Sequence, residues 1–586
     1  MKTNFIEKPF RSSTDRLGLD TETIKGYCRL LCLSDGRSFR VESLDDVLYF
    51  IKCFMRVKKT YFFAWNADFD IQALLKYFNK RTLNALLKGV EILYEHPKAS
   101  FSVQYIKGKY LQFDGNYIFD AYQYYHLPLK NAAVKYLGEG EGKLDVDGSK
   151  ISEENIYSPG VEEYCKRDAL AALKLFSRFH AALPEKLERT RPISNAFYAY
   201  SYFRSELSLN RPKPDVNKYF RNAYHGGRFE IFERGRFKGL YVYDINSAYP
   251  HEIARLPALD RAHYVNFAGF MPSASFSVLK VKVRLLDPFV GPLLVKDRGL
   301  CVYPSGWVES YITKGEYERI KDLEHEISEG FHVFCGKGRP FREKVEELYL
   351  KKQSSGFPLP FKIILNSLYG KTGQATPKYI DVRELNEVVE VVDYVDEDGI
   401  TYVKFEDLSK SNFVYASEIT ARTRLRMYDV VKAHPESVVM VSTDSVVSTK
   451  ALDLPLSEKM GDWKLEKWDE GIFIGSGLYF YRKGVEWAGK FRGFNFKDDK
   501  VRSILDTILK SKGDKVEFTT KKRFSIQEAR RLHDEELGNQ ILDVTRKLNL
   551  NFDRKRLWTS AWKKGSEVGT KRIRSSAIYS QNILTP

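Results

Sequence analysis

The chain has 586 residues, too many for one hydrophobic core, so we expect several structural units. Hydrophobic residues make up 43% of it, which is typical of a globular protein, and no run approaches the ~18 apolar residues of a membrane span. Lys and Arg outnumber Asp and Glu by 94 to 77, a net charge of +17 that favours a polyanionic partner, and no membrane partner is expected.

The six cysteines are scattered, and no Cys-x-x-Cys pair occurs. This pattern argues against a zinc or iron–sulfur module and against a disulfide framework. The first residues, M-K-T-N-F-I-E-K-P-F, lack the apolar core of a signal peptide. We therefore expect a cytoplasmic protein with reduced thiols.

The first third of the chain alternates between strand and helix patterns. Strands are expected over 17–23 and 61–65, and helices over 71–78 and 161–183. Such alternation predicts an α/β domain. The polar stretch 210–217, which contains prolines, is expected to be a linker.

The second part begins near Tyr224 and mixes both kinds of element. It contains a strand over 240–243 and helices over 314–321 and 341–352. The segment S-S-G-F-P-L-P separates the last helix from the next, K-I-I-L-N-S-L-Y-G, and Gly370 is expected to end that helix. Residues 371–410 have an acidic β pattern.

Four acidic residues of the first domain form the first candidate site. Asp20 and Glu22 lie two apart on a strand and so share one face. Asp70 follows in W-N-A-D-F-D, where Asn66 suits a helix N-cap and capping alone explains the acids equally well. Asp168 lies within an apolar helix stripe, where an inward carboxylate needs a salt-bridge partner or a metal.

Three ordered motifs of this region, D-T-E, N-A-D-F-D and Y-C-K-R-D, resemble the exonuclease motifs of family B DNA polymerases. The resemblance implies that the four acids hold two metal ions roughly 3.5–4 Å apart. It also implies that Thr23, Asn66 and Phe69 contact a frayed primer end and that Tyr164 positions the attacking water. Lys143 matches a lysine of the protein-primed branch of the family.

Two further aspartates, Asp244 and Asp444, each follow an apolar run that predicts a strand. Between them, Lys362, Asn366 and Tyr369 have the i, i+4, i+7 spacing of one helix face, which an ordinary exposed face would share. Separated carboxylates that fold together suit Mg²⁺ bridging triphosphate oxygens.

The segments Y-V-Y-D-I-N-S-A-Y-P, K-I-I-L-N-S-L-Y-G and V-V-M-V-S-T-D-S-V-V resemble polymerase motifs A, B and C of the same family. This resemblance makes Asp244 and Asp444 the metal ligands and Tyr249 the steric gate against a 2′-hydroxyl. Lys362 and Asn366 then bind the nucleotide, with Tyr369 near the nascent base pair. Lys351 is a candidate for a second phosphate contact.

Two motifs complete the resemblance, and two positions depart from it. Y-H-G-G-R resembles the family's Tyr-x-Gly-Gly motif, and Tyr479 matches the tyrosine of Lys-x-Tyr. Ser442 replaces the first acid of motif C, and Gly477 replaces the lysine, whose role Arg482 or Lys483 would have to take. The expected DNA contacts of these motifs are Tyr224, Gly226, Gly227, Arg228 and Tyr479.

The resemblance implies an RNase H-like exonuclease domain followed by a right-hand polymerase. The expected parts are exonuclease (1–190), palm (191–287 and 412–525), fingers (341–370) and thumb (526–586), with TPR1-like (288–340) and TPR2-like (371–411) insertions. Two Mg²⁺ ions per site are expected, with Mn²⁺ as an alternative.

The resemblance implies as partners template-primer DNA, dNTPs and a terminal protein that primes viral or plasmid replication, in the host cytoplasm if the source is a virus. A monomer is expected. Three alternatives stay open: an RNA- or DNA-primed family B replicase, an exonuclease or repair factor with a decayed polymerase site, and a non-catalytic DNA-binding protein.

Overall fold

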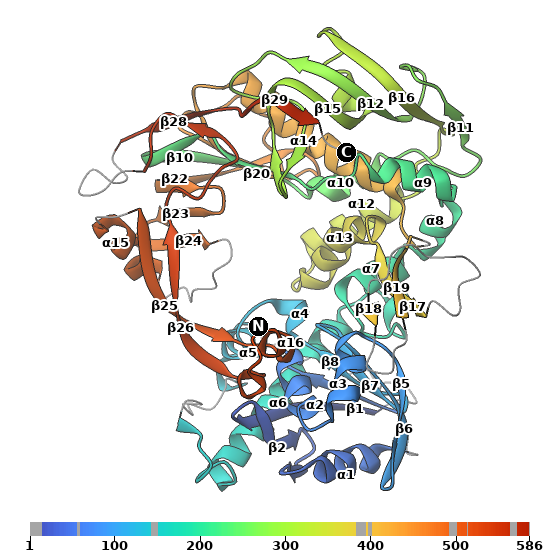
Figure 1. The fold of residues 1–586 in the computed structure, drawn as a ribbon, viewed down its shortest axis with the longest axis vertical. Helices are drawn as coiled ribbons and strands as arrows, with labels where there is room; N and C mark the ends of the chain where they lie inside the picture. Colours follow the sequence, from blue (N-terminus) through green and yellow to red (C-terminus); the bar gives the residue numbers. More distant parts are fainter. Residues whose placement is uncertain are drawn as a thin grey trace. The chain divides into compact units, whose positions relative to one another are not determined.

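The computed structural model describes residues 15–55, 59–141, 150–381, 394–395, 401–408, 410–491, 501–511, 514–562 and 571–584. The chain forms two compact units (Figure 1). Unit 1 consists of Met1–Tyr202, Ser355–Ile364 and Lys521–Val544. Unit 2 consists of Phe203–Ser354, Leu365–Thr520 and Thr545–Pro586. Each unit therefore contains chain segments that lie far apart in the sequence.

Unit 1 is built on an eight-stranded mixed sheet in the order β3-β2-β1-β4-β8-β7-β6-β5. The predicted strands 17–23 and 61–65 are confirmed as β1 and β4, which pair in parallel, and β4 pairs in parallel with β8. The strands are β1 (Asp15–Ile24), β2 (Tyr27–Leu33), β3 (Ser38–Arg40), β4 (Thr60–Ala64), β5 (Ile92–His96), β6 (Ala99–Ile106), β7 (Tyr110–Phe113) and β8 (Asn116–Asp120).

The helices of unit 1 confirm the α/β prediction. The helix expected over 71–78 is α2, which begins at Asp68, and the one expected over 161–183 is α6. α6 begins where the Ser158 hydroxyl accepts the Val161 N–H and a proline takes the first turn. The helices are α1 (Leu44–Phe54), α2 (Asp68–Leu75), α3 (Lys80–Leu87), α4 (Tyr122–Tyr125), α5 (Leu129–Tyr136), α6 (Pro159–Ala181) and α7 (Asn195–Tyr202).

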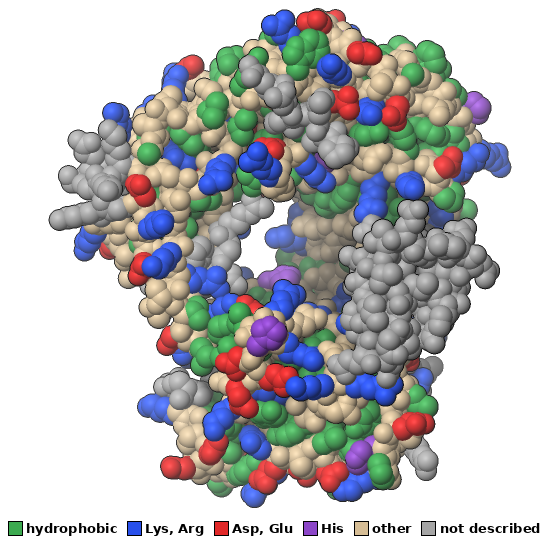
Figure 2. All heavy atoms as spheres, viewed as in Figure 1, with side chains coloured by type: hydrophobic (Ala, Val, Ile, Leu, Met, Phe, Trp, Pro, Cys, Tyr) green, Lys and Arg blue, Asp and Glu red, His purple; other side chains and the backbone are tan. Residues whose placement is uncertain are grey.

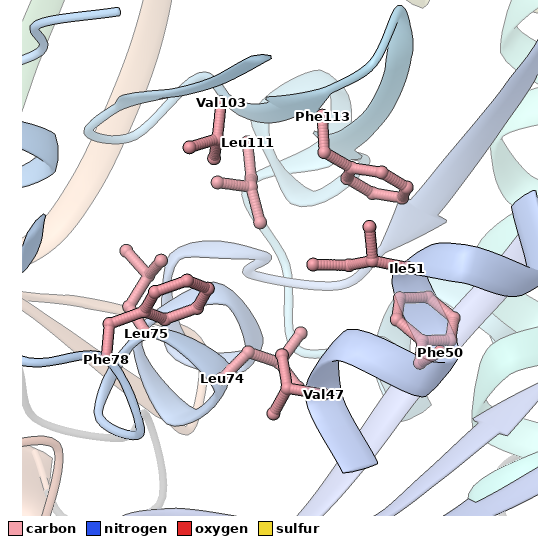
Figure 3. A pocket seen from close by; sticks show the side chains of 9 residues that line it. All are labelled: Val47, Phe50, Ile51, Leu74, Leu75, Phe78, Val103, Leu111 and Phe113. Carbon is pink, nitrogen blue, oxygen red and sulfur yellow. The ribbon is translucent and has the colours of Figure 1, made fainter. Parts of the chain in front are cut away.

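A small gap lies in the apolar core of unit 1, between α1, α2 and the sheet (Figure 3). Its walls are entirely hydrophobic side chains, among them Phe50, Leu74 and Phe113. Because no polar group faces the gap, it offers nothing to orient a ligand or hold a water. We interpret it as a packing defect.

Unit 2 is centred on a sheet in the order β24-β23-β22-β10-β21-β20-β9, packed against the largely buried helix α14 (Phe413–Ala433) (Figure 1). The predicted strand 240–243 lies inside β10, which is longer than expected. The strands are β9 (Arg228–Ile231), β10 (Glu233–Ile245), β20 (Val438–Thr443), β21 (Ser445–Ser448), β22 (Trp463–Gly475), β23 (Leu478–Lys483) and β24 (Glu486–Phe491).

A second sheet of unit 2 has the order β11-β16-β12-β15-β29. Its strands are β11 (His263–Asn266), β12 (Phe276–Leu285), β15 (Ser305–Thr313), β16 (His325–Phe334) and β29 (Tyr579–Leu584), and β13 (Val295–Asp297) pairs with β14 (Leu300–Val302). The helix expected over 314–321 is shorter, α11 (Lys314–Tyr317), because the chain has to turn into β16.

The helical hairpin around 354–360 is confirmed. α12 (Arg342–Ser354) ends where predicted, and α13 (Leu359–Thr372) follows after the glycine and proline. The predicted helix end at Gly370 is wrong, because α13 continues to Thr372, whose hydroxyl donates to the Tyr369 carbonyl at 2.7 Å. The expected β pattern that follows is confirmed as the sheet of β17 (Thr376–Asp381), β18 (Tyr394–Val395) and β19 (Thr401–Asp407).

The predicted linker 210–217 is wrong. Asn210 and Asn217 are buried, and their side-chain oxygens accept the N–H groups of Leu259 at 2.7 Å and Phe413 at 2.6 Å. Pro214 starts a helix instead of breaking one, since it occupies the first helical position of α9 (Pro214–Arg221). The polar composition here therefore serves internal hydrogen bonding.

The remaining elements are α8 (Arg204–Leu209), α10 (Ala248–Ala254), α15 (Val501–Lys510), α16 (Ile526–Arg531), β25 (Lys515–Arg523), β26 (Ile541–Asn549), β27 (Leu557–Trp558) and β28 (Ile573–Ser576). Within the described ranges, no helix is long and apolar enough to cross a membrane. On the face that Figure 2 draws, Lys and Arg side chains are spread among Asp and Glu.

Candidate active sites

The first candidate site starts on β1. Thr21 is buried, and its neighbours Asp20 and Glu22 project together from the other side of the strand. Their carboxylates and the Cys165 thiol of α6 offer ligand atoms that all lie within 4.8 Å of one another. Two carboxylates at this spacing fit a hard divalent cation. The thiol is an element of this cluster that the sequence motifs do not predict.

A glycine lets α6 approach β1 closely. A Cβ added at Gly18 would lie 1.8 Å from the carbonyl oxygen of Ala169, so a larger residue would push the helix away. The Cys165 thiol donates to the Asp20 carbonyl at 3.4 Å and makes a second link. This packing brings buried Asp168, one residue before Ala169, beside the strand that carries Asp20.

Asp70 is buried and points to a different partner. The Thr21 hydroxyl donates to its Oδ1 at 2.6 Å, and burial raises the pKa of Asp70 to about 7. Neither Asp70 nor Asp168 belongs to the described group of ligand atoms within 4.8 Å. The structure thus brings Asp20 and Glu22 together and leaves Asp70 bonded to Thr21.

The predicted N-cap role of Asn66 is wrong. Asn66 has a left-handed backbone (φ +63°), the helix cap is Ala67, and the Asn66 N–H donates to Asp120 Oδ1 at 2.9 Å. Asp120 also accepts the Tyr122 N–H at 2.9 Å, so it fixes the turn that exposes Asn66. Asp120 ends an apolar strand, the same signal that marks Asp244, and the motifs did not include it.

The other predicted exonuclease residues differ in how deeply they are buried, and one of them lies outside the described residues. Thr23 follows a bulge in β1 after Glu22, and Phe69 is half-buried in the first turn of α2. Tyr164 is buried one helical turn before Asp168, as the spacing predicted. Lys143 lies outside the described residues.

The second candidate site lies where β10 and the β20–β21 turn meet. Asp244 pairs with Ser445 across the two strands, and the Ile245 N–H donates to the Asp444 carbonyl at 3.0 Å. Thr443 has a left-handed backbone (φ +62°), which makes the tight turn that the sequence predicted. Burial, and then the nearby Asp244 carboxylate, raise the pKa of Asp444 to about 6.

A lysine that the motifs did not indicate neutralises one of these acids. Lys464 pairs with Asp244 across β22 and β10, and its Nζ lies 2.9 Å from Asp244 Oδ2. Ser442 lies on β20, the strand that leads into the turn. Its backbone carbonyl accepts the Asp444 N–H at 2.7 Å. The carboxylates of Asp244 on β10 and Asp444 in the adjoining turn still offer the hard oxygen donors that Mg²⁺ prefers.

Three tyrosines from three segments meet beside this turn. The ring of Tyr249 lies 4.4 Å from that of Tyr369, centroid to centroid, and the Tyr224 and Tyr369 hydroxyls are 3.1 Å apart. Burial raises the pKa of both Tyr249 and Tyr224. The cluster joins the predicted motif A, motif B and Tyr-x-Gly-Gly residues.

The Y-H-G-G-R loop packs on the motif C turn. A Cβ at Gly227 would lie 2.8 Å from Thr443 Cγ2 and 3.1 Å from the Tyr249 hydroxyl, whereas Gly226 is exposed with open space. Arg424 of α14, ion-paired with Glu316 at 2.7 Å, donates to the Gly226 carbonyl at 3.1 Å. The missing side chain of Gly227 thus allows this loop to contact Thr443 and Tyr249.

The DNA-contact role predicted for Arg228 is wrong. Its side chain is fully buried, 2.6 Å from the Glu230 carboxylate, and it donates to the Gly291 carbonyl at 3.0 Å. An arginine sealed in this way is satisfied by the protein and holds β9 in place. It has no surface to offer to a phosphate.

The primer contact predicted for Tyr479 stays a prediction. Its ring is buried, 5.8 Å from that of Phe473 in a stacked aromatic cluster. Gly477 has φ +93° in the turn between β22 and β23, where a lysine would be strained, which explains the departure from Lys-x-Tyr. Arg482 lies 3.5 Å from Glu470, and Lys483 pairs with Glu466.

On α13, Lys362 and Asn366 are exposed while Ile364, Leu365 and Leu368 are buried, so the predicted polar face is present.

The two lysines at the end of α12 have different partners. Lys351 Nζ lies 2.5 Å from Glu347 on its own helix, and it is Lys352 whose Nζ donates to Ser247 Oγ of motif A at 3.0 Å. The geometry therefore favours Lys352 over the predicted Lys351 as the second cation.

Residues 95–433, more than half of the chain, match the family model of type B DNA polymerases, organellar and viral. The chain belongs to this family. It is 25% identical to the DNA polymerase of Acidianus bottle-shaped virus over 70% of this chain and 63% of that one. It is 24% identical to the DNA-directed DNA polymerase of Enterobacteria phage PRD1 over 58% of this chain and 64% of that one. The chain thus spans less than two thirds of these relatives' length.

The fold also resembles solved structures. Phi29 DNA polymerase matches with a TM-score of 0.66 and 15% identity, covering 92% of this chain and all of that one. Its complex with primer-template DNA and incoming nucleotide matches with a TM-score of 0.65. This likeness confirms the mixed α/β multidomain fold.

Proposed function

We propose that this chain is a template-directed DNA polymerase that extends a DNA primer with dNTPs. The observation that carries the proposal is the pair of Asp244 on β10 and Asp444 in the adjoining β20–β21 turn, beside the cluster of Tyr224, Tyr249 and Tyr369. Family membership supports the same reading.

Divalent ions bound by the two aspartates would lower the pKa of the primer 3′-hydroxyl and hold the departing pyrophosphate. With a pKa of about 6, Asp444 is mostly ionised above neutral pH and ready to act as a ligand. Tyr249 packs on Tyr369, which fixes the position of its ring, and the ring would exclude a ribose 2′-hydroxyl. Lys362 and Lys352 would bind phosphates as point charges.

We propose that unit 1 is a 3′–5′ exonuclease that uses Asp20, Glu22, Asp70 and Asp168. Asp20 and Glu22 already share a cluster, while Asp70 Oδ1 accepts a hydrogen bond from the Thr21 hydroxyl. Exposed Asn66 and half-buried Phe69 beside them would bind the primer end. The same region would remove misincorporated nucleotides.

Priming by a terminal protein, in which a protein hydroxyl accepts the first nucleotide, is the proposed mode of initiation. The match to the organellar and viral family and the likeness to phi29 DNA polymerase support it. The division into palm, fingers, thumb and two insertions, and the monomeric state, stay predictions.

Two variants test both activities on one primed template with Mg²⁺. Asp444→Ala should abolish extension and retain 3′–5′ degradation of the primer, and the double variant Asp20→Ala with Glu22→Ala should do the reverse. A wild-type protein that degrades but never extends would support a decayed polymerase site, for which Ser442 and the Lys464–Asp244 pair would be the cause.

The priming mode needs a separate measurement. Incubation with a candidate terminal protein and labelled dNTP should give a covalent protein–nucleotide adduct. Extension of oligonucleotide primers without any adduct would favour the RNA- or DNA-primed replicase.

A further inference from the structure

A segment from near the end of the chain completes unit 1. Residues 521–544, hereafter the tip segment, form the connection between β25 and β26 and include α16. Ile526 of this segment is only 4% exposed and belongs to the apolar core cluster that contains Leu74 and Phe101. The tip segment is thus a built-in part of the nuclease unit.

Arg523 of the tip segment holds the motif that carries the proposed primer contact. Its guanidinium donates to the Asp68 carbonyl at 2.7 Å and to Asp68 Oδ2 at 3.3 Å. The same group lies over the Phe69 ring, 5.2 Å from the centroid. Asn539 Oδ1 accepts from Arg523 Nε at 2.9 Å and fixes the guanidinium plane.

Asn539 attaches the tip segment to the next residue of α2, Phe69. Its amide donates to the Phe69 carbonyl at 3.1 Å and to the Gly26 carbonyl at 3.2 Å. Asn539 is only 1% exposed, so these bonds are shielded from water. Arg523 and Asn539 together bind the two consecutive carbonyls of Asp68 and Phe69.

Gln72 of α2 connects the tip segment to the same acid from inside the core. Its Oε1 accepts the Ile526 N–H at 3.0 Å, and its Nε2 donates to Asp68 Oδ2 at 2.9 Å. The other oxygen of Asp68 accepts from Tyr105 and, at 3.3 Å, from the Gly108 N–H. Asp68 is therefore fully used in orienting the first turn of α2, which also carries Asp70.

We propose that Arg523 and Asn539 are positioning residues of the 3′–5′ exonuclease site: the tip segment sets the place of Phe69 and the orientation of the α2 turn that carries Asp70. The inference rests on the proposed nuclease function of unit 1. Misplacing a substrate-contacting group by about 1 Å can cost about 100-fold in rate. We therefore expect the anchoring of this turn to affect the rate of degradation.

The test compares two anchors of the same tip segment. Arg523→Ala removes the contacts to Asp68 and Phe69, and Arg530→Ala removes a contact to Asn84 of α3 that lies outside the motif. The kcat and KM for degradation of a labelled single-stranded oligonucleotide with Mg²⁺ are measured for each, alongside extension of a primed template by the same preparation.

Arg523→Ala should raise KM and lower kcat/KM by about 10- to 100-fold, and Arg530→Ala should stay within about threefold of wild type. Arg523→Lys should recover part of the loss, because a lysine keeps the charge near Asp68 without the planar fork. Asn539→Ala should shift KM in the same direction as Arg523→Ala.

Equal losses in Arg523→Ala and Arg530→Ala would overturn the positioning role and leave the tip segment a structural support only. If wild type degrades no oligonucleotide at all, the proposed nuclease function fails and the inference fails with it, which the wild-type control reveals before any variant is compared.

Discussion

The two carboxylate sites are assembled from different kinds of element. In unit 2, Asp244 lies on β10 and Asp444 in the turn beside it, and the β10–β21 register with a backbone hydrogen bond fixes their spacing. In unit 1, the acids come from a strand and two helices, and their spacing depends on side-chain packing and on one hydroxyl that holds Asp70. Register tolerates little variation, whereas helix packing can shift, so the proposed nuclease site is the more easily disturbed.

The sites also differ in how they treat negative charge without a metal. Asp70 is buried with a raised pKa, so protonation limits its charge. Asp244 is partly exposed and is neutralised by Lys464. In unit 1 a proton on Asp70, and in unit 2 the ammonium group of Lys464, offset part of the negative charge when no metal is bound, and each competes with a divalent ion for a carboxylate.

Gly18→Ala should have the largest effect, because its Cβ would meet the Ala169 carbonyl at 1.8 Å and move α6 with Asp168. We expect exonuclease activity to fall by about 100-fold or more and unit 1 to lose at least about 1–3 kcal/mol. Degradation of a labelled oligonucleotide and thermal unfolding measure both. Gly160→Ala, a site on α6 with open space, is the control and should leave both unchanged.

Gly227→Ala should damage the other site less, because the neighbours of its Cβ are side-chain atoms of Thr443 and Tyr249 at 2.8 and 3.1 Å. Primer extension should fall by about 10- to 100-fold, since the shift reaches the turn that carries Asp444. Gly226→Ala faces open space and should extend normally. Similar rates for the two variants would show that this loop does not set the site.

Lys464→Met should lower the Mg²⁺ concentration needed for half-maximal extension by about two- to fivefold, as expected for loss of a solvent-screened competitor for Asp244. The measurement is a Mg²⁺ titration of primer extension. Lys467→Met, on the same strand beside Tyr241, is the matched control. A higher Mg²⁺ requirement in Lys464→Met would mean that the lysine helps bind the triphosphate instead.

Asp70→Asn should raise the melting temperature of the metal-free protein at pH 8. The folded pKa of Asp70, about 7, exceeds its ordinary value of 3.8, so stability falls as pH rises between these values and the loss is complete above pH 7. The gain is at most about 4 kcal/mol, or several degrees, and should vanish at pH 4. An unchanged melting temperature in EDTA at pH 8 would contradict the raised pKa.

The elements that carry the candidate residues were predicted correctly where a local pattern determines them. The strands of Asp20 and Asp244, the helix stripe around Asp168 and the turn before Asp444 all follow from short-range periodicity and turn chemistry. These patterns could be read from the sequence because each of them lies within a single element.

The failures concern partners from distant elements. Arg228 looked like a surface cation in its motif, but Glu230 and the Gly291 carbonyl bury it. Lys464 and Arg523 carry no local signal, because their importance comes from Asp244 and Asp68, which reach them only through the tertiary fold. Asn66 failed as a cap because it has a left-handed backbone, in a turn where Asp120 from another strand accepts its N–H, and the cap is Ala67.

The placement of Ile526 has a consequence for biosynthesis. Unit 1 gathers its core from three stretches of chain, and Ile526 and Phe357 join residues that emerge from the ribosome far earlier. Such long-range closures are slow, and a nascent chain lacking them exposes apolar surface. Unit 1 therefore cannot finish folding until translation has passed residue 544, which makes the first domain of the sequence one of the last to be completed.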